Sequence, residues 1–144
     1  MATTGEATGV LIGPMAFDVV SGSGHTLRLD VNAADGGEDS GPTPMELLLM
    51  ALAGCTGMDV ISILRKKRQD VRAYTVHVHG TRAEDHPRVY TEITVEHVLT
   101  GHNLSEAAVA RALELSDTKY CGVELTLNKT AHVTTSYQII ESDA

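Results

Sequence analysis

The chain has 144 residues, 42% of them hydrophobic, which suits one globular domain with an ordinary core. Its formal net charge of −8 argues against nucleic acid or an anionic membrane as a partner, because either would require a basic face. The first residues, MATTGEATG, have neither a positive start nor a long apolar run, so we expect no secretory signal. Two cysteines are too few for a disulfide scaffold or a four-cysteine zinc site, which favours a cytoplasmic protein with free or reversibly oxidised thiols.

Three short strand-like runs, at residues 9–12, 15–20 and 26–31, open the chain. The glycines between the second and third runs suit a hairpin turn. The polar, glycine-rich stretch 32–41 then predicts a loop. Residues 1–40 are therefore expected to form N-terminal strands and a loop.

A long apolar helix is predicted over residues 43–69. Its start has the pattern of a capping box, with Thr43 as N-cap, Pro44 at the first helical position and Glu46 three residues after the cap. The basic run 65–68 suits the negative end of the helix dipole.

The same helix predicts a second subunit. From residue 47 to residue 64 its only charged side chain is Asp59, and apolar side chains occur on every side. A helix that is apolar all round must be covered all round, and one small sheet covers one face only. Ala51, Gly54 and Gly57 leave room for another backbone, so we predict an intertwined homodimer. A membrane span is the weaker interpretation, because glycine, threonine, aspartate and serine make the segment too polar for its length.

Residues 71–82 and 89–99 alternate apolar and polar side chains, so they predict a β-hairpin with one face toward water. His77 and His79 share a face of the first strand, where two imidazoles could hold a metal ion. No third ligand stands at a matching spacing. Solvent-facing histidines are the preferred interpretation, and we predict neither a metal site nor a cofactor.

A shorter helix is predicted over residues 104–116, with Asn103 as its N-cap and a glutamate at the third position. A break at 117–122 and a final strand at 130–140 follow. The order of strands, helix, strands, helix and strand predicts an α+β fold with antiparallel pairing, in one domain over residues 1–144.

The two cysteines are the residues that could carry chemistry. Cysteine reacts as its thiolate, and a position in the middle of a helix gives Cys55 no help from the positive end of the dipole. Asp59, one turn further on, disfavours a negative sulfur. Judged by its setting alone, Cys55 is most simply a small buried apolar residue, and a redox pair with Cys121 is the open alternative.

The sequence GPTPMELLLMALAGCTGMD at residues 41–59, together with ELSDTKYCGV around Cys121, resembles the OsmC/Ohr family, in its branch of OsmC-like redox proteins. The resemblance covers nearly the whole chain. It implies a thiol-dependent peroxidase that reduces organic hydroperoxides in oxidative or osmotic stress defence. Cys55 would attack the peroxide and become a sulfenic acid, Cys121 would condense with it to a disulfide, and an external dithiol of the lipoyl type would restore both.

The resemblance also suggests which residues tune the thiolate. The family's peroxidases use an arginine from the N-terminal strands or loops to stabilise the thiolate. Residues 1–27 here contain no arginine or lysine, so Arg28 is the first candidate. The family's glutamate directly follows the helix-start proline, but Glu46 stands one position later, about 100° around the helix. Capping is therefore its preferred role and thiolate tuning the alternative. Because the sequence differs from the family's peroxidases in these two ways, a second hypothesis stays open. It is a non-catalytic dimer of the same fold that binds a small apolar ligand.

Overall fold

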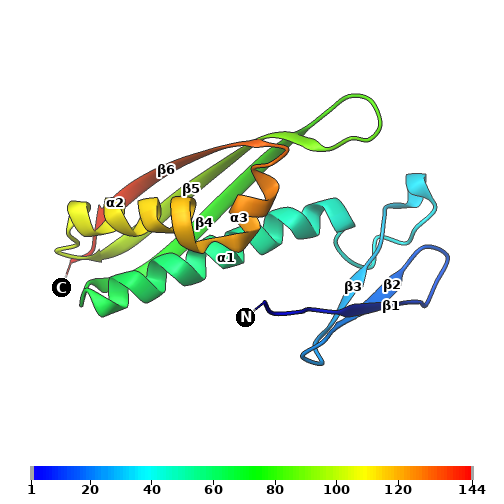
Figure 1. Cartoon of the computed structure of the whole chain (residues 1–144), viewed down its shortest axis with the longest axis horizontal. Helices are drawn as coiled ribbons and strands as arrows, with labels where there is room; N and C mark the ends of the chain where they lie inside the picture. Colours follow the sequence, from blue (N-terminus) through cyan, green and yellow to red (C-terminus); the bar gives the residue numbers. More distant parts are fainter. Residues whose placement is uncertain (1, 144) are drawn as a thin grey trace. The chain divides into compact units, whose positions relative to one another are not determined.

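The computed structural model describes residues 2–143 and divides into two compact units, with the division between Leu48 and Leu49. Strands, a long helix, a hairpin, shorter helices and a last strand follow one another along the chain, which confirms the predicted α+β class (Figure 1). The expectation of one domain over residues 1–144 stays a prediction.

The first unit holds a small antiparallel sheet of three strands in chain order. They are β1 (Ala7–Leu11), β2 (Phe17–Ser21) and β3 (Thr26–Leu29), close to the three runs expected from the sequence. Several large apolar side chains of this unit are exposed to between 41% and 58%. These are Val10, Leu11, Ile12, Met15, Phe17 and Leu27.

The long helix α1 (Pro44–Lys66) begins with the predicted capping box. The Thr43 hydroxyl accepts from the backbone N–H of Glu46 at 3.1 Å, and the Glu46 carboxylate accepts from the backbone N–H of Thr43 at 3.0 Å. The helix ends three residues before the predicted end, because Arg68 adopts a left-handed φ of 56°. The N–H groups of Arg68 and Gln69 then donate back to the carbonyls of Arg65 and Leu64, which closes the helix in a Schellman arrangement.

The second unit contains a mixed sheet. The hairpin of β4 (Asp70–Arg82) and β5 (Tyr90–His102) is antiparallel as predicted. The last strand, β6 (His132–Glu141), differs from the prediction because it pairs parallel to β5. Two helices, α2 (Glu106–Leu115) and α3 (Gly122–Leu127), connect these strands and return the chain to the end of the sheet where β5 begins.

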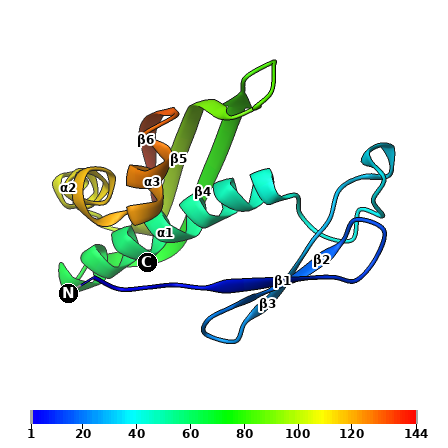
Figure 2. The same ribbon diagram turned by 45° about the vertical axis from the view of Figure 1, so that its right-hand side comes forward.

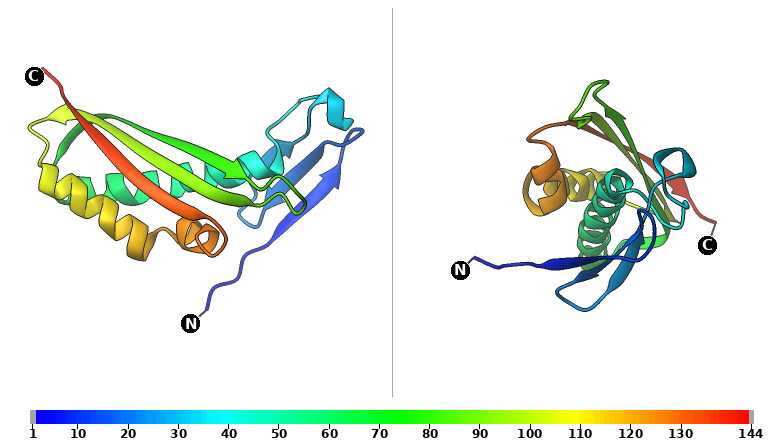
Figure 3. Two further views of the ribbon diagram at one scale, coloured as in Figure 1. Left: turned by 90° about the horizontal axis from the view of Figure 1, so that it is seen from above. Right: turned by 90° about the vertical axis from the view of Figure 1, so that its right-hand side faces the viewer.

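Helices α1 and α2 lie on one face of this sheet, and the views in Figures 2 and 3 agree on that arrangement. Their shared core is made of aliphatic side chains from both helices and from β5. Its fully buried members include Val60, Leu64, Leu99 and Val109. The opposite face of the hairpin carries exposed His77 and His79, which confirms the predicted face toward water.

Helix α1 is buried along one stripe only, at every fourth residue. The stripe consists of Leu52, Thr56, Val60 and Leu64. Met50 and Met58 on other sides are 52% and 73% exposed. By length and composition α1 is the one helix of the described chain that could cross a membrane, with 22% of its most apolar window buried, but core helices of globular proteins pass the same test. An uncovered apolar surface of this kind is typical of an interaction face, and the homodimer stays a prediction.

We predict that the protein runs in solution at twice its chain mass of 15.3 kDa. Met58→Glu should weaken association by about tenfold or more, because a carboxylate would have to be desolvated if the partner covers this face. Light scattering after size-exclusion chromatography over a concentration series measures both the mass in solution and the strength of association. Thr94→Glu, at an exposed position of β5, is the matched control and should leave the mass unchanged. A wild-type chain that stays at the monomer mass at every concentration contradicts the prediction.

Candidate functional site

The fold brings the two cysteines together although 66 positions (121 − 55) separate them. Both thiols are free, Cys55 partly buried and Cys121 completely buried. Their sulfur atoms and a carboxylate oxygen of Asp59 all lie within 4.8 Å of one another. The two predicted catalytic residues therefore share one site in the second unit, and an acid that the sequence placed only as a neighbour of Cys55 completes it.

A π-helical turn at Ser116–Tyr120 places Cys121. The N–H of Cys121 donates to the carbonyl of Ser116 at 2.9 Å, five residues back, so the turn holds one residue more than an α-helical turn would. Cys121 then serves as the N-cap of α3, and its sulfur accepts from the N–H of Glu124 at 3.3 Å. The sequence predicted only a break at 117–122, so the turn and α3 are both findings of the structure.

Buried hydroxyls connect α1 to the end of α2 beside the sulfurs. The Ser116 hydroxyl donates to Asp59 Oδ2 at 3.2 Å and lies 2.9 Å from the hydroxyl of Thr56. Since Ser116 has a single hydroxyl hydrogen and gives it to the carboxylate, Thr56 must be the donor in the other bond. These two consecutive hydrogen bonds fix the orientation of Asp59 next to Cys55.

The setting of Cys121 keeps it protonated. Burial, and then the hydrogen bond with Cys55, raises the pKa of the Cys121 thiol to about 12, while the N–H of Glu124 acts in the opposite direction. Cys121 is therefore a thiol at neutral pH and can donate to the sulfur of Cys55. The difference in exposure makes Cys55 the sulfur that a solute meets first.

Two carboxyl groups form a hydrogen-bonded pair beside Cys121. Glu124 is only 4% exposed, and burial followed by the charge of Asp117 raises its pKa to about 8. The pair therefore holds one shared proton at neutral pH. One oxygen of each group, Oδ1 of Asp117 and Oε1 of Glu124, is buried without a hydrogen-bond partner. Both residues also line an open cavity of about 690 Å³ that reaches β6.

A tyrosine–histidine pair extends the polar cluster into the sheet. The Tyr74 hydroxyl lies 2.6 Å from Nδ1 of His97, and the two rings stack. Burial lowers the pKa of His97 to about 4, so this imidazole is neutral at pH 7. Burial and then the charges of Asp117 and Asp59 raise the pKa of Tyr74. The sequence did carry a signal for His97, because it alternates in phase with the buried side chains of β5.

The two residues predicted as possible thiolate-tuning groups have other partners. Arg28 forms an ion pair with Asp18 inside the first unit, with Nε 2.9 Å from Oδ1. Glu46 is engaged in the capping box with Thr43. A role of either residue in tuning Cys55 stays a prediction.

His97→Gln should change how stability depends on pH. Between pH 6.5 and about 4 the unfolded chain takes up a proton at His97 that the folded chain does not, so the free energy of unfolding falls as the pH falls. Protonation of His97 in the unfolded chain lowers the free energy of unfolding by at most about 3 kcal/mol. The glutamine variant lacks this loss and keeps an acceptor for Tyr74. Denaturant unfolding at pH 7, 5.5 and 4.5 measures the slope, with His79→Gln as the exposed control. Equal slopes for wild type and His97→Gln would refute the assignment.

The comparisons with known proteins agree with this architecture. A family model described as OsmC-like protein matches residues 37–136. Protein YhfA of Escherichia coli (strain K12) is 45% identical over 120 residues, which are 83% of this chain and 87% of YhfA. A hypothetical protein from Aquifex aeolicus VF5 has a solved structure that is 30% identical, with a TM-score of 0.86 and coverage of 99% of this chain and 100% of that one. The organic hydroperoxide resistance protein OsmC from Legionella pneumophila, at 18% identity, shares the fold with a TM-score of 0.68 over 96% of this chain and 98% of its own. The chain therefore belongs to the OsmC-like protein family.

Proposed function

We propose that this protein is a thiol-dependent peroxidase that reduces organic hydroperoxides in stress defence, with Cys55 as the peroxidatic and Cys121 as the resolving cysteine. The observation that carries the proposal is the meeting of the two free sulfurs from distant segments. Their unequal exposure supports the division of roles, because a peroxide reaches the half-buried Cys55 before the fully buried Cys121.

The proposed reaction balances with two thiols and one hydroperoxide. The Cys55 thiolate attacks the terminal oxygen, an S–O bond forms as the O–O bond breaks, and the alkoxide leaves and is protonated to an alcohol. The sulfur of Cys121 then attacks the sulfenic acid of Cys55, the S–S bond forms, and the hydroxyl group leaves as water with the proton of Cys121. An external dithiol of the lipoyl type, oxidised to its own disulfide, would restore both thiols by exchange.

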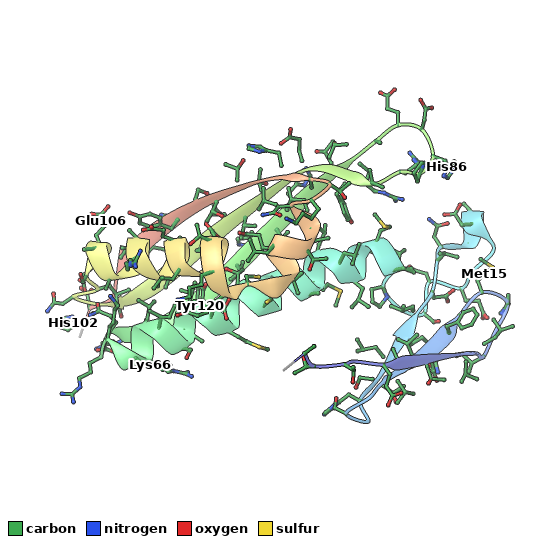
Figure 4. All side chains as sticks on the ribbon, viewed as in Figure 1. Met15, Lys66, His86, His102, Glu106 and Tyr120 are labelled. Carbon is green, nitrogen blue, oxygen red and sulfur yellow. The ribbon has the colours of Figure 1, made fainter. Side chains whose placement is uncertain are left out.

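The shape of the surroundings supports an organic peroxide. A pocket of about 420 Å³ borders Asp59 and continues along α1 to its last turn. Its lining is Asp59, Ser62, Ile63, Lys66, Lys67, Leu115 and Tyr120. Figure 4 labels two of these side chains, Tyr120 after α2 and Lys66 at the end of α1. The pocket's apolar side chains, Ile63, Leu115 and Tyr120, lie beside Asp59, whose carboxylate is within 4.8 Å of both sulfurs. They favour a molecule with an apolar body over hydrogen peroxide.

The main test is disulfide formation. Substoichiometric cumene hydroperoxide should convert the reduced chain to a form about 2 Da lighter by mass spectrometry, without alkylation of either thiol, since one S–S bond replaces two S–H bonds. Cys121→Ser should stop at the sulfenic acid of Cys55, and Cys55→Ser should not react. The proposal is wrong if both thiols of the wild-type chain can still be alkylated after excess peroxide.

The acid pair beside Cys121 gives a second test. Cys121 must lose its proton as it attacks, and Glu124, which shares a hydrogen bond with Asp117, is the carboxyl group that interacts with it. Glu124→Gln should therefore slow the second step by about tenfold or more, the usual scale for loss of a general base. A dimedone-type trap would detect a longer-lived sulfenic acid at Cys55. Glu114→Gln, on the exposed side of α2, should behave as wild type, and an equally short lifetime in Glu124→Gln would exclude this role.

A non-catalytic dimer that binds a small apolar ligand is the second candidate function. It is favoured by one observation: of the described groups that shift the pKa of Cys121, Asp117 and Glu124, none is cationic. A peroxidatic thiolate usually has a positive neighbour. A Cys55→Ser variant that keeps full function in cells would select this candidate over the peroxidase.

A further inference from the structure

We propose that the reduced site binds a thiophilic divalent cation, best matched by Zn²⁺, through the sulfurs of Cys55 and Cys121 and a carboxylate oxygen of Asp59. The inference deepens the proposed function because it concerns the same two thiols. It requires only that they are free, and it does not require that they reduce peroxides.

The spacing of the three donors fits one ion. Their ligand atoms all lie within 4.8 Å of one another. A tetrahedral zinc site with Zn–S bonds of about 2.3 Å holds its sulfurs about 3.8 Å apart. A small movement of the ligand atoms toward one another would therefore give the spacing of a zinc site. Thiolates with one carboxylate suit zinc, whereas magnesium and calcium prefer oxygen alone. Three protein ligands leave a fourth position open for water or another small donor.

The scaffold orients these donors before any ion arrives. Cys55 and Asp59 stand one turn apart on a 23-residue helix, and Cys121 is fixed as the N-cap of α3. The Ser116 hydroxyl occupies Oδ2 of Asp59, which leaves Oδ1 for a cation, and the N–H of Glu124 contacts the sulfur of Cys121. Hydrogen bonds of this kind to ligand atoms are what orients the donors of a metal centre.

The charge around the site also favours a cation. Asp59 lies within 4.8 Å of both sulfurs, Glu124 contacts Cys121 through its N–H, and Asp117 is hydrogen-bonded to Glu124. None of the ion pairs among residues 2–143 involves any of these three acids. Two buried carboxyl oxygens of Asp117 and Glu124 have no hydrogen-bond partner. A bound cation offsets the cost of burying several acidic groups together, and an anionic ligand would increase it.

The exposed histidines of β4 provide the competing site. His77 and His79 can offer two nitrogens, but among the described residues Cys55, Asp59 and Cys121 form the one group of three or more donors close enough to hold an ion. A double variant His77→Gln/His79→Gln is therefore a matched control, since it removes the surface donors and leaves the buried ones.

Metal binding and disulfide formation exclude each other. Two thiols take up Zn²⁺ and release two protons, which gives a zinc dithiolate. When a hydroperoxide takes two electrons from these sulfurs, the disulfide forms and Zn²⁺ loses both sulfur ligands. The O–O bond of the hydroperoxide breaks, and with two protons taken up the products are an alcohol and a water. Bound Zn²⁺ should therefore slow oxidation, and oxidation should release the ion.

The experiment titrates the reduced, metal-free full chain with Zn²⁺ against a chromophoric chelator under anaerobic conditions, and with Co²⁺ for its spectrum. We expect one ion per chain and a thiolate-to-cobalt charge-transfer band. Cys55→Ser or Cys121→Ser should lower the affinity about 100-fold or more, and Asp59→Asn about tenfold or more. The His77→Gln/His79→Gln variant should bind as wild type. In the unmodified chain Zn²⁺ should protect both thiols from alkylation, a measurement that does not depend on any variant folding.

The outcomes separate this inference from the proposed function. Absence of the cobalt band, or binding that disappears in the histidine variant and persists in Cys55→Ser, overturns the metal site. If the metal-free chain still forms the Cys55–Cys121 disulfide with cumene hydroperoxide, the peroxidase proposal stands without it. Stoichiometric zinc binding in a chain that never forms the disulfide would have the opposite meaning, a metal site without peroxidase chemistry.

Discussion

The packing of one stripe of α1 against the sheet and α2 determines the rest of the second unit. Because the stripe repeats every fourth residue, it sets the rotation of the helix, and that rotation turns Cys55 and Asp59 toward the end of α2. Thr56, a member of the stripe, meets Ser116 through its hydroxyl at 2.9 Å. With the Ser116–Asp59 hydrogen bond, this polar contact beside an apolar interface aligns two segments that are far apart in the sequence.

The sequence predicted the elements whose signals are local. The capping box at Thr43 and Glu46 and the alternation of the hairpin each depend on residues within a few positions of one another, and both are present in the structure. The predicted cap Asn103 is wrong: it adopts a left-handed φ of 50°, and Ser105 two residues later accepts from the backbone of Ala108. Both residue types are good caps, so only the path of the chain decides between them. The parallel pairing of β6 depends on the whole connection from β5 and has no short-range signal.

The site was predictable only in part, for a similar reason. The cysteine pair followed from a resemblance to a family, because nothing near Cys55 in the sequence points to a residue 66 positions away. Tyr74, His97 and Asp117 were not predicted, since their roles arise from tertiary contacts with one another and with α1. His97 stands at an inward position of an alternating strand, where a polar side chain needs a partner, and this pattern is the one trace that the sequence held.

The position of Cys121 depends on the number of residues in the π-helical turn at Ser116–Tyr120. Each residue of a regular helix turns the chain by about 100°, so deleting one residue here would restore an ordinary helix and swing the following sulfur away from its partner. The loop between β4 and β5 carries no such restriction, because its ends are held by strand pairing. Relatives that keep both cysteines should therefore vary freely in length at the hairpin and hardly at all between the second helix and the second cysteine.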